Sequence, residues 1–118
     1  MQATKELCLF CRIISGDIPA RKMFEGDDVI AFEDINPQAP THILVIPREH
    51  IASLAEVNDR NKHVIANVIA RAAEIARALH LEEEGFRLVN NCGEAAGQTV
   101  FHIHFHLLGG RPFKWPPG

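Results

Sequence analysis

The stretch His102-Ile103-His104-Phe105-His106-Leu107-Leu108 alternates histidines with large apolar residues. Successive side chains of a β-strand point to opposite faces of the sheet, so this alternation predicts a strand with one histidine face and one apolar face. The apolar face belongs against a core. Three imidazoles on the other face indicate a polar site, because histidines scattered at random rarely share one face of a core strand.

These three imidazoles do not fit a single metal ion. Alternate strand residues lie about 6.6–7 Å apart, which would put His102 and His106 about 13 Å apart. Because zinc–nitrogen bonds are about 2.0–2.1 Å long, two rings could share an ion but three could not. A phosphate group fits the row better, since neutral imidazole attacks phosphorus and protonated imidazole donates to oxyanions or to a leaving group. The middle residue, His104, is best placed to attack.

The remaining sequence predicts an α+β domain with an antiparallel sheet of about five strands. We expect a short helix over 7–14, a long helix over about 60–79 capped by Asp59, and strands over 22–24, 29–33, 42–46, 86–90 and 99–108. The apolar stripe of the long helix is Val64, Ile65, Val68, Ile69, Ala72, Ile75, Ala76 and Leu79. A chain of 118 residues can bury one core but not two, so we expect a single domain over 1–118 with an irregular tail, 109–118.

Composition and charge exclude several classes of protein. The chain is 47% hydrophobic and 23% charged, which is typical of a folded globular protein and not of a disordered one. A formal net charge of −3 gives no basic excess for nucleic acid. No apolar run approaches 18 residues, so we expect no membrane partner. Three cysteines favour reduced thiols in the cytoplasm over a disulfide framework.

Three motifs together resemble the histidine-triad (HIT) family. The first is the His-x-His-x-His run over 102–106, and the second is DINPQAPTHILVIP over 34–47. The third is the ending GGRPFKWPPG over 109–118, which is similar to the Hint branch of the family. The resemblance runs from about Leu9 to Gly118. It implies a HIT-like fold, and a homodimer whose central sheet continues across the two-fold axis.

The resemblance also implies an activity. Hint proteins are purine nucleoside phosphoramidases, which hydrolyse the P–N bond of nucleoside 5′-phosphoramidates and need no cofactor for catalysis. His104 would form a covalent nucleotidyl-histidine, His106 would contact the phosphate and the leaving group, and His42 and His102 would complete a hydrogen-bonded set. Two alternatives stay open: a dinucleoside polyphosphate hydrolase of the Fhit branch, which the Trp-Pro-Pro-Gly ending disfavours, and a nucleotide-binding scaffold, which the intact triad disfavours.

The same resemblance implies a pocket for a purine nucleoside monophosphate. Asp34 would bind the ribose hydroxyls. The base would be enclosed by Leu9, Phe10, Ile13, Phe32 and Ile35, and the phosphate approached by Asn91, Gly97, Gln98 and Thr99, in addition to His104 and His106. Trp115 would lie near the active site of the partner subunit. The apolar members of this set are equally typical of an ordinary core, and Asp34 of an ordinary turn.

The pair Cys8 and Cys11 has the C-x₂-C spacing of half a zinc site. Some bacterial members of the family complete such a pair with two histidines, which in this chain correspond to His50 and His102. The resemblance therefore implies a closed Cys₂His₂ set with a structural zinc ion. Reduced cysteines without a metal are the alternative. Cys92 stands apart from this set, and His63 and His80 are expected to be solvated.

Overall fold

The computed structural model describes residues 7–118. Along the chain it contains α1 (Leu9–Ser15), β1 (Lys22–Glu25), β2 (Val29–Glu33), β3 (Thr41–Pro47), the 3₁₀ helix η2 (Leu54–Glu56), α2 (Lys62–Ala78), η3 (Leu81–Glu83), β4 (Phe86–Val89), η4 (Glu94–Ala96) and β5 (Phe105–Gly109). The strands form one antiparallel sheet in the order β1-β2-β3-β5-β4. The predicted α+β class and five-stranded sheet are confirmed. None of the helices within residues 7–118 is long and apolar enough to span a membrane.

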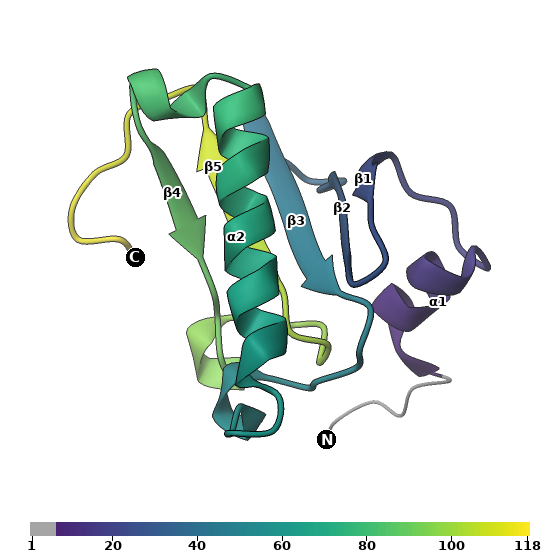
Figure 1. Cartoon of the computed structure of the whole chain (residues 1–118). Helices are drawn as coiled ribbons and strands as arrows, with labels where there is room; N and C mark the ends of the chain where they lie inside the picture. The colour runs from purple at the N-terminus through teal and green to yellow at the C-terminus, as the bar shows by residue number, and fades with distance from the viewer. Residues whose placement is uncertain (1–6) are drawn as a thin grey trace.

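Both faces of the sheet are covered, and alternate residues of the same strands contribute their side chains to the core on each face. The long helix α2 lies across the middle of one face, whereas α1 lies beyond the β1–β2 side (Figure 1). The core under α2 includes Val29, Ala31, Ile43, Val45, Val68, Ala72, Ile103, Phe105 and Leu107. The core on the α1 side includes Phe10, Ile13, Ile30, Phe32, Leu44 and Ile46. Strand alternation therefore places the triad histidines, which alternate with Ile103, Phe105 and Leu107, on the α1 side.

Both helices begin later than predicted. α1 begins at Leu9, with Cys8 as its N-cap, and ends where Gly16 takes the left-handed conformation at φ +89°. The prediction that Asp59 caps the long helix is wrong: Asn61 holds that position, and the Asp59 carboxylate pairs with Lys62 at 3.2 Å. Two members of the predicted apolar stripe, Ile69 and Leu79, are exposed. The sheet therefore covers fewer residues of the stripe than the apolar pattern predicts.

The last strand is much shorter than predicted. β5 begins at Phe105, so His102 and His104 precede it. Two bonds explain the difference. The Ile103 N–H donates to the carbonyl of Ile51 at 2.6 Å, and the His102 ring nitrogen Nε2 lies 2.8 Å from the carbonyl of Pro47. The chain before β5 is therefore tied to the segment after β3 and not to a neighbouring strand. The alternation survives, because Ile103 and the histidines still face opposite ways.

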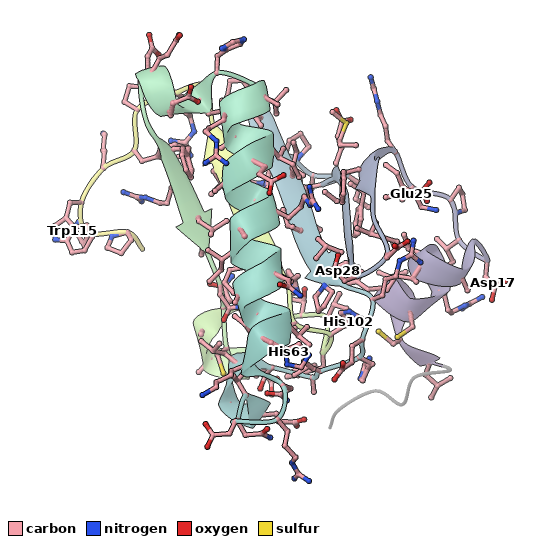
Figure 2. The ribbon with its side chains drawn as sticks, in the orientation of Figure 1. Asp17, Glu25, Asp28, His63, His102 and Trp115 are labelled. Carbon is pink, nitrogen blue, oxygen red and sulfur yellow. The ribbon has the colours of Figure 1, made fainter. Side chains whose placement is uncertain are left out.

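The tail returns along the edge formed by β4. Arg87 donates to the carbonyl of Lys114 at 2.9 Å, and the Arg111 guanidinium lies over the Phe113 ring at 4.3 Å. Trp115 is 84% exposed and projects away from the rest of the fold (Figure 2). Its indole therefore contributes little to the core of this chain.

Candidate active site and metal centre

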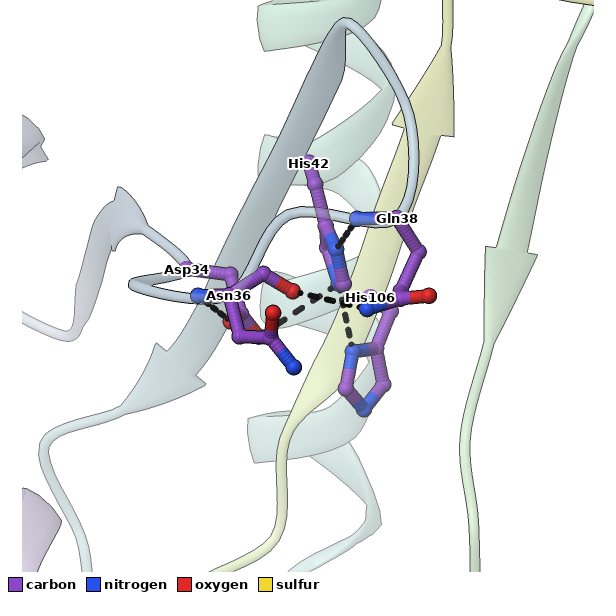
Figure 3. Close-up of polar contacts among 5 residues, drawn as sticks. All are labelled: Asp34, Asn36, Gln38, His42 and His106. Atoms are coloured by element: carbon purple, nitrogen blue, oxygen red, sulfur yellow. Dashed lines mark hydrogen bonds and ion pairs between the residues drawn. The ribbon is translucent and has the colours of Figure 1, made fainter.

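His42 and His106 form a hydrogen-bonded pair across two neighbouring strands. Register pairs Leu44 of β3 with His106 of β5, so His42 is the diagonal neighbour of His106 on the same face. The His42 Nε2 atom lies 2.8 Å from His106 Nδ1 and 3.5 Å from the Asp34 carboxylate (Figure 3). Burial lowers the pKa of His106 to about 4 and also lowers the pKa of His42, although Asp34 acts in the opposite direction. Both rings are therefore neutral near pH 7.

The hydrogen bonds then fix which ring nitrogens carry protons. The Gln38 main-chain N–H donates to His42 Nδ1 at 3.0 Å (Figure 3), so the proton of the neutral His42 ring is on Nε2. That proton is directed at His106 Nδ1, which accepts it and leaves the His106 proton on Nε2. His106 consequently presents an N–H donor on the side away from His42.

His104 has the complementary arrangement. Its Nδ1 lies 2.8 Å from the carbonyl oxygen of His102, and because a carbonyl can only accept, the Nδ1–H must donate. Burial lowers the pKa of His104, which keeps the ring neutral and leaves a lone pair on Nε2. The Phe10 ring stands edge-on to it, with ring centroids 5.0 Å apart. A neutral imidazole held in this tautomer is a nucleophile.

His104 and His106 line a cavity of about 360 Å³ between α1 and the sheet. Its size lies in the range of small-molecule sites. The predicted residues that line it are Leu9, Phe10, Ile13, Phe32, Asp34, Ile35, Thr99, His104 and His106. The cavity thus has apolar walls from α1 and β2, a carboxylate at the end of β2, and two imidazoles from the histidine face.

Other predicted residues lie elsewhere. Asn91 and Gly97 are not among the residues around this cavity, and the buried Gln98 amide is engaged in the loop, accepting from the Gly93 N–H and donating to the carbonyl of Ala52. His42 lies behind His106, and His102 lies at the metal-ligand cluster described below. Sequence reasoning missed further lining residues, namely Ile18, Pro19, Ala20, Glu33, Leu44 and Val100. Leu44 could have been found from the strand alternation that it shares with His42 and Ile46; the connector 18–20 carries no such signal.

The four predicted zinc ligands come together. Cys8, Cys11, His50 and His102 offer one ligand atom each, all within 4.8 Å of one another. Cys8 caps α1 and Cys11 lies in its first turn, while His102 lies between that helix and the sheet (Figure 2). Each sulfur is 3.5 Å from His102 Nδ1, and His50 Nδ1 is 3.3 Å from both Cys11 Sγ and His102 Nδ1.

This arrangement fits a tetrahedral zinc ion. Zn–S bonds of about 2.3 Å and Zn–N bonds of about 2.0–2.1 Å give tetrahedron edges of roughly 3.3–3.8 Å. His102 donates from Nε2 to the carbonyl of Pro47, so the lone pair of its neutral ring is on Nδ1, facing the cluster. Burial lowers the pKa of His102 to about 4, which favours this unprotonated form. His63 and His80 are exposed, as expected.

Comparisons with known proteins show which family model, sequences and structures this chain resembles. The model of the HIT domain family matches residues 15–113. A HIT family hydrolase from Legionella pneumophila is 53% identical, with a TM-score of 0.92, over 94% of this chain and 99% of that one. A histidine triad nucleotide-binding protein from Candida albicans is 33% identical, with a TM-score of 0.78, over 92% and 82%. A 14 kDa zinc-binding protein of Zea mays is 44% identical over 112 residues, covering 93% of this chain and 87% of that protein.

Proposed function

The chain belongs to the HIT domain family, and from this premise we propose that it is a purine nucleoside phosphoramidase acting on nucleoside 5′-phosphoramidates. The observation that carries the proposal is the position of His104: a neutral ring with its Nδ1–H held by the carbonyl of His102, at a cavity that His106 also lines. The apolar wall from α1 and β2 suits a purine base. Asp34, between that wall and His106, suits the ribose hydroxyls.

The reaction proceeds in two displacements at phosphorus. The Nε2 lone pair of His104 forms a bond to phosphorus while the P–N bond to the amine breaks. The amine nitrogen keeps the electron pair of the broken bond and leaves after taking a proton from the substrate or from solvent. In the second displacement a water oxygen forms a bond to phosphorus and loses a proton to solvent. The bond between phosphorus and His104 Nε2 breaks, and its electron pair returns to Nε2 as the lone pair. The products are a nucleoside monophosphate and a free amine.

The neighbouring groups stabilise the charge that develops. As His104 forms its bond, the ring becomes positive, and its Nδ1–H donates more strongly to the His102 carbonyl. The His106 Nε2–H is available to a phosphate oxygen. His42 holds His106 in that tautomer, and the main-chain N–H of Gln38 holds His42. His42 and Gln38 thus position the donor without contacting substrate.

Replacing the nucleophile tests this proposal. We expect His104→Ala to abolish turnover of an adenosine 5′-phosphoramidate while the Kd for adenosine monophosphate, measured by calorimetry, stays within several-fold of wild type. His80→Ala, at an exposed histidine, is the matched control and should keep full activity. Undiminished turnover in His104→Ala would remove the mechanism.

Substrate comparison separates the enzymatic alternatives. A phosphoramidase should turn over the P–N substrate much faster than a diadenosine polyphosphate, whereas a Fhit-like hydrolase should show the reverse. A scaffold should bind nucleotide and turn over neither substrate. The Trp-Pro-Pro-Gly ending supports the first of these outcomes.

We further propose that Cys8, Cys11, His50 and His102 hold a structural zinc ion. When bound, zinc would cross-link the start of α1 to the segment after β3 and the segment before β5. Support comes from the edge lengths of the ligand set and from the name of the Zea mays relative. The proposed reaction has no step at this ion.

A homodimer is part of the proposal, and β4 is the edge that supports it. β4 pairs only with β5 in the described sheet, and the tail meets this edge through the Arg87 side chain, so the outer main-chain groups of β4 can still pair with a second copy. Three of its four side chains are only half-buried in the single chain, and Phe86 is 38% exposed. Analytical ultracentrifugation should give twice the chain mass of 13.1 kDa. Replacing Phe86 with Asp should shift the mass toward a single chain, and a monomeric wild type would contradict the proposal.

A further inference from the structure

The segment that carries the nucleophile lies outside the paired part of the sheet. The register of β5 with β3 ends at Phe105, and its register with β4 ends at His106. His104 therefore precedes the first paired residue. Small displacements of an attacking atom lower the rate of reaction steeply. Both the ring and the main chain of His104 must therefore be held in place if the Nε2 lone pair is to point at phosphorus.

Asn90 holds the main chain of His104. It is the first residue after β4, and its side-chain Nδ2 donates to the carbonyl oxygen of His104 at 2.9 Å. The residue before, Ile103, is held through its N–H by Ile51. The ring of His104 is held separately by the carbonyl of His102. Contacts to Asn90, Ile51 and His102 thus fix the nucleophile and the residue before it.

The other polar atom of the Asn90 side chain argues against a purely stabilising role. Its Oδ1 is buried and accepts no hydrogen bond from the described residues. A buried acceptor without a partner destabilises the folded state, and this cost opposes the stability that the bond from Nδ2 to the His104 carbonyl contributes. The favourable contact that the structure gives the Asn90 side chain is the one to His104.

We propose that Asn90 is a positioning residue for the nucleophile: it orients His104 through its main chain and does not contact the substrate. This inference rests on the proposed function, since it assumes that His104 attacks phosphorus. It assigns a role to a residue that lies outside the cavity, because Asn90 is not among the lining residues.

Two substitutions test the inference, with Asn67→Leu as the matched control on the exposed side of α2. Asn90→Leu removes both the donor and the unpaired acceptor, and Asn90→Asp keeps the shape but points a carboxylate oxygen at the His104 carbonyl. We expect kcat to fall at least tenfold in both variants, with KM and the Kd for adenosine monophosphate within twofold of wild type. Asn90→Leu loses the bond to the His104 carbonyl together with the unpaired Oδ1, and these two changes act in opposite directions on the free energy of unfolding. Activity should therefore be compared at a temperature at which urea unfolding shows wild type and both variants to be fully folded, so that lost activity cannot be ascribed to unfolding.

A second measurement does not depend on turnover. The ¹⁵N chemical shifts of the His104 ring should report a single Nδ1–H tautomer in wild type and in Asn67→Leu, and a mixture of tautomers in Asn90→Leu. If wild type proves inactive toward phosphoramidates, the proposed function fails, and this spectrum alone decides the role of Asn90. A His104 tautomer unchanged in both Asn90 variants, or kcat within twofold of an active wild type, would overturn the inference.

Discussion

The main-chain carbonyl of His102 accepts the Nδ1–H of His104 at 2.8 Å, while the ring of His102 belongs to the cysteine–histidine cluster. One residue therefore joins the nucleophile to the candidate metal centre. Phe10 strengthens the connection: it lies between Cys8 and Cys11 in the sequence, and its ring contacts both His102 and His104. Loss of order at the cluster would thus loosen the cavity wall and the carbonyl that sets the tautomer of His104.

Because His102 joins the two sites, the first prediction concerns the zinc content of the protein and its effect on stability. We expect about one zinc ion per chain by atomic emission, and a Tm that falls by roughly 10 °C when a chelator removes it, because an ion bound only by the folded state stabilises that state. Cys11→Ser should lose the ion and show the lower Tm without chelator. Cys92→Ser, outside the cluster, is the control. Equal zinc content in the two variants would contradict the assignment.

Stability should depend on pH through His106. In the unfolded chain its pKa is about 6.5, whereas burial lowers it to about 4 in the folded state, where His42, His104 and Asp34 face it. Between these values the unfolded state binds the extra proton, so the free energy of unfolding should fall as the pH is lowered from about 6.5 to about 4. Urea titrations should show a shallower decline for His106→Gln. The same slope in both proteins would show that His106 does not contribute.

Asp34 should discriminate ribose from deoxyribose. Its carboxylate lines the cavity, and the Asn36 N–H holds one oxygen at 2.8 Å, which orients the group at the end of β2. We expect Asp34→Asn to raise KM for an adenosine phosphoramidate about tenfold, because an amide loses one acceptor for a pair of hydroxyls. The 2′-deoxy substrate should already have a raised KM with wild type and should change little on substitution. An equal loss for both substrates would mean that Asp34 acts on His42 instead.

Much of this site could be predicted from sequence because alternation depends only on an extended chain. His102 and His104 share a face with His106 even though they precede β5, since Ile103 packs into the core under α2 while both histidine rings contact Phe10 on the α1 side. Strand ends were harder to predict: they depend on partners distant in sequence, such as the Pro47 carbonyl and Ile51, which no local pattern indicates. The cap of α2 was predicted wrongly for a different reason, since Asp59 and Asn61 are both common capping residues and lie two positions apart.

Asn90 shows where sequence reasoning stops. An asparagine after a strand is typical of a turn, and nothing in the pattern indicates that its amide reaches a carbonyl fourteen residues away. The cavity wall from residues 18–20 is similar, because a connector has no periodicity. By contrast, the C-x₂-C pair predicted a half site by spacing alone, and only the resemblance supplied His50 and His102 as its partners.

The last prediction concerns Gly110, which joins β5 to the tail. Its φ of +90° is strained for any other residue, and an added Cβ would lie 2.9 Å from Pro40 Cβ, in the loop whose Gln38 N–H orients His42. Gly85 gives a matched control, because its φ of +104° carries the same strain while an added Cβ meets nothing within 4 Å. Gly85→Ala should lower the free energy of unfolding by about 1–3 kcal/mol. Gly110→Ala should lower it by about 1–3 kcal/mol more, through overlap with Pro40. Equal losses in urea unfolding would mean that the loop moves aside at no cost, and that its packing against Gly110 does not hold Gln38 in place.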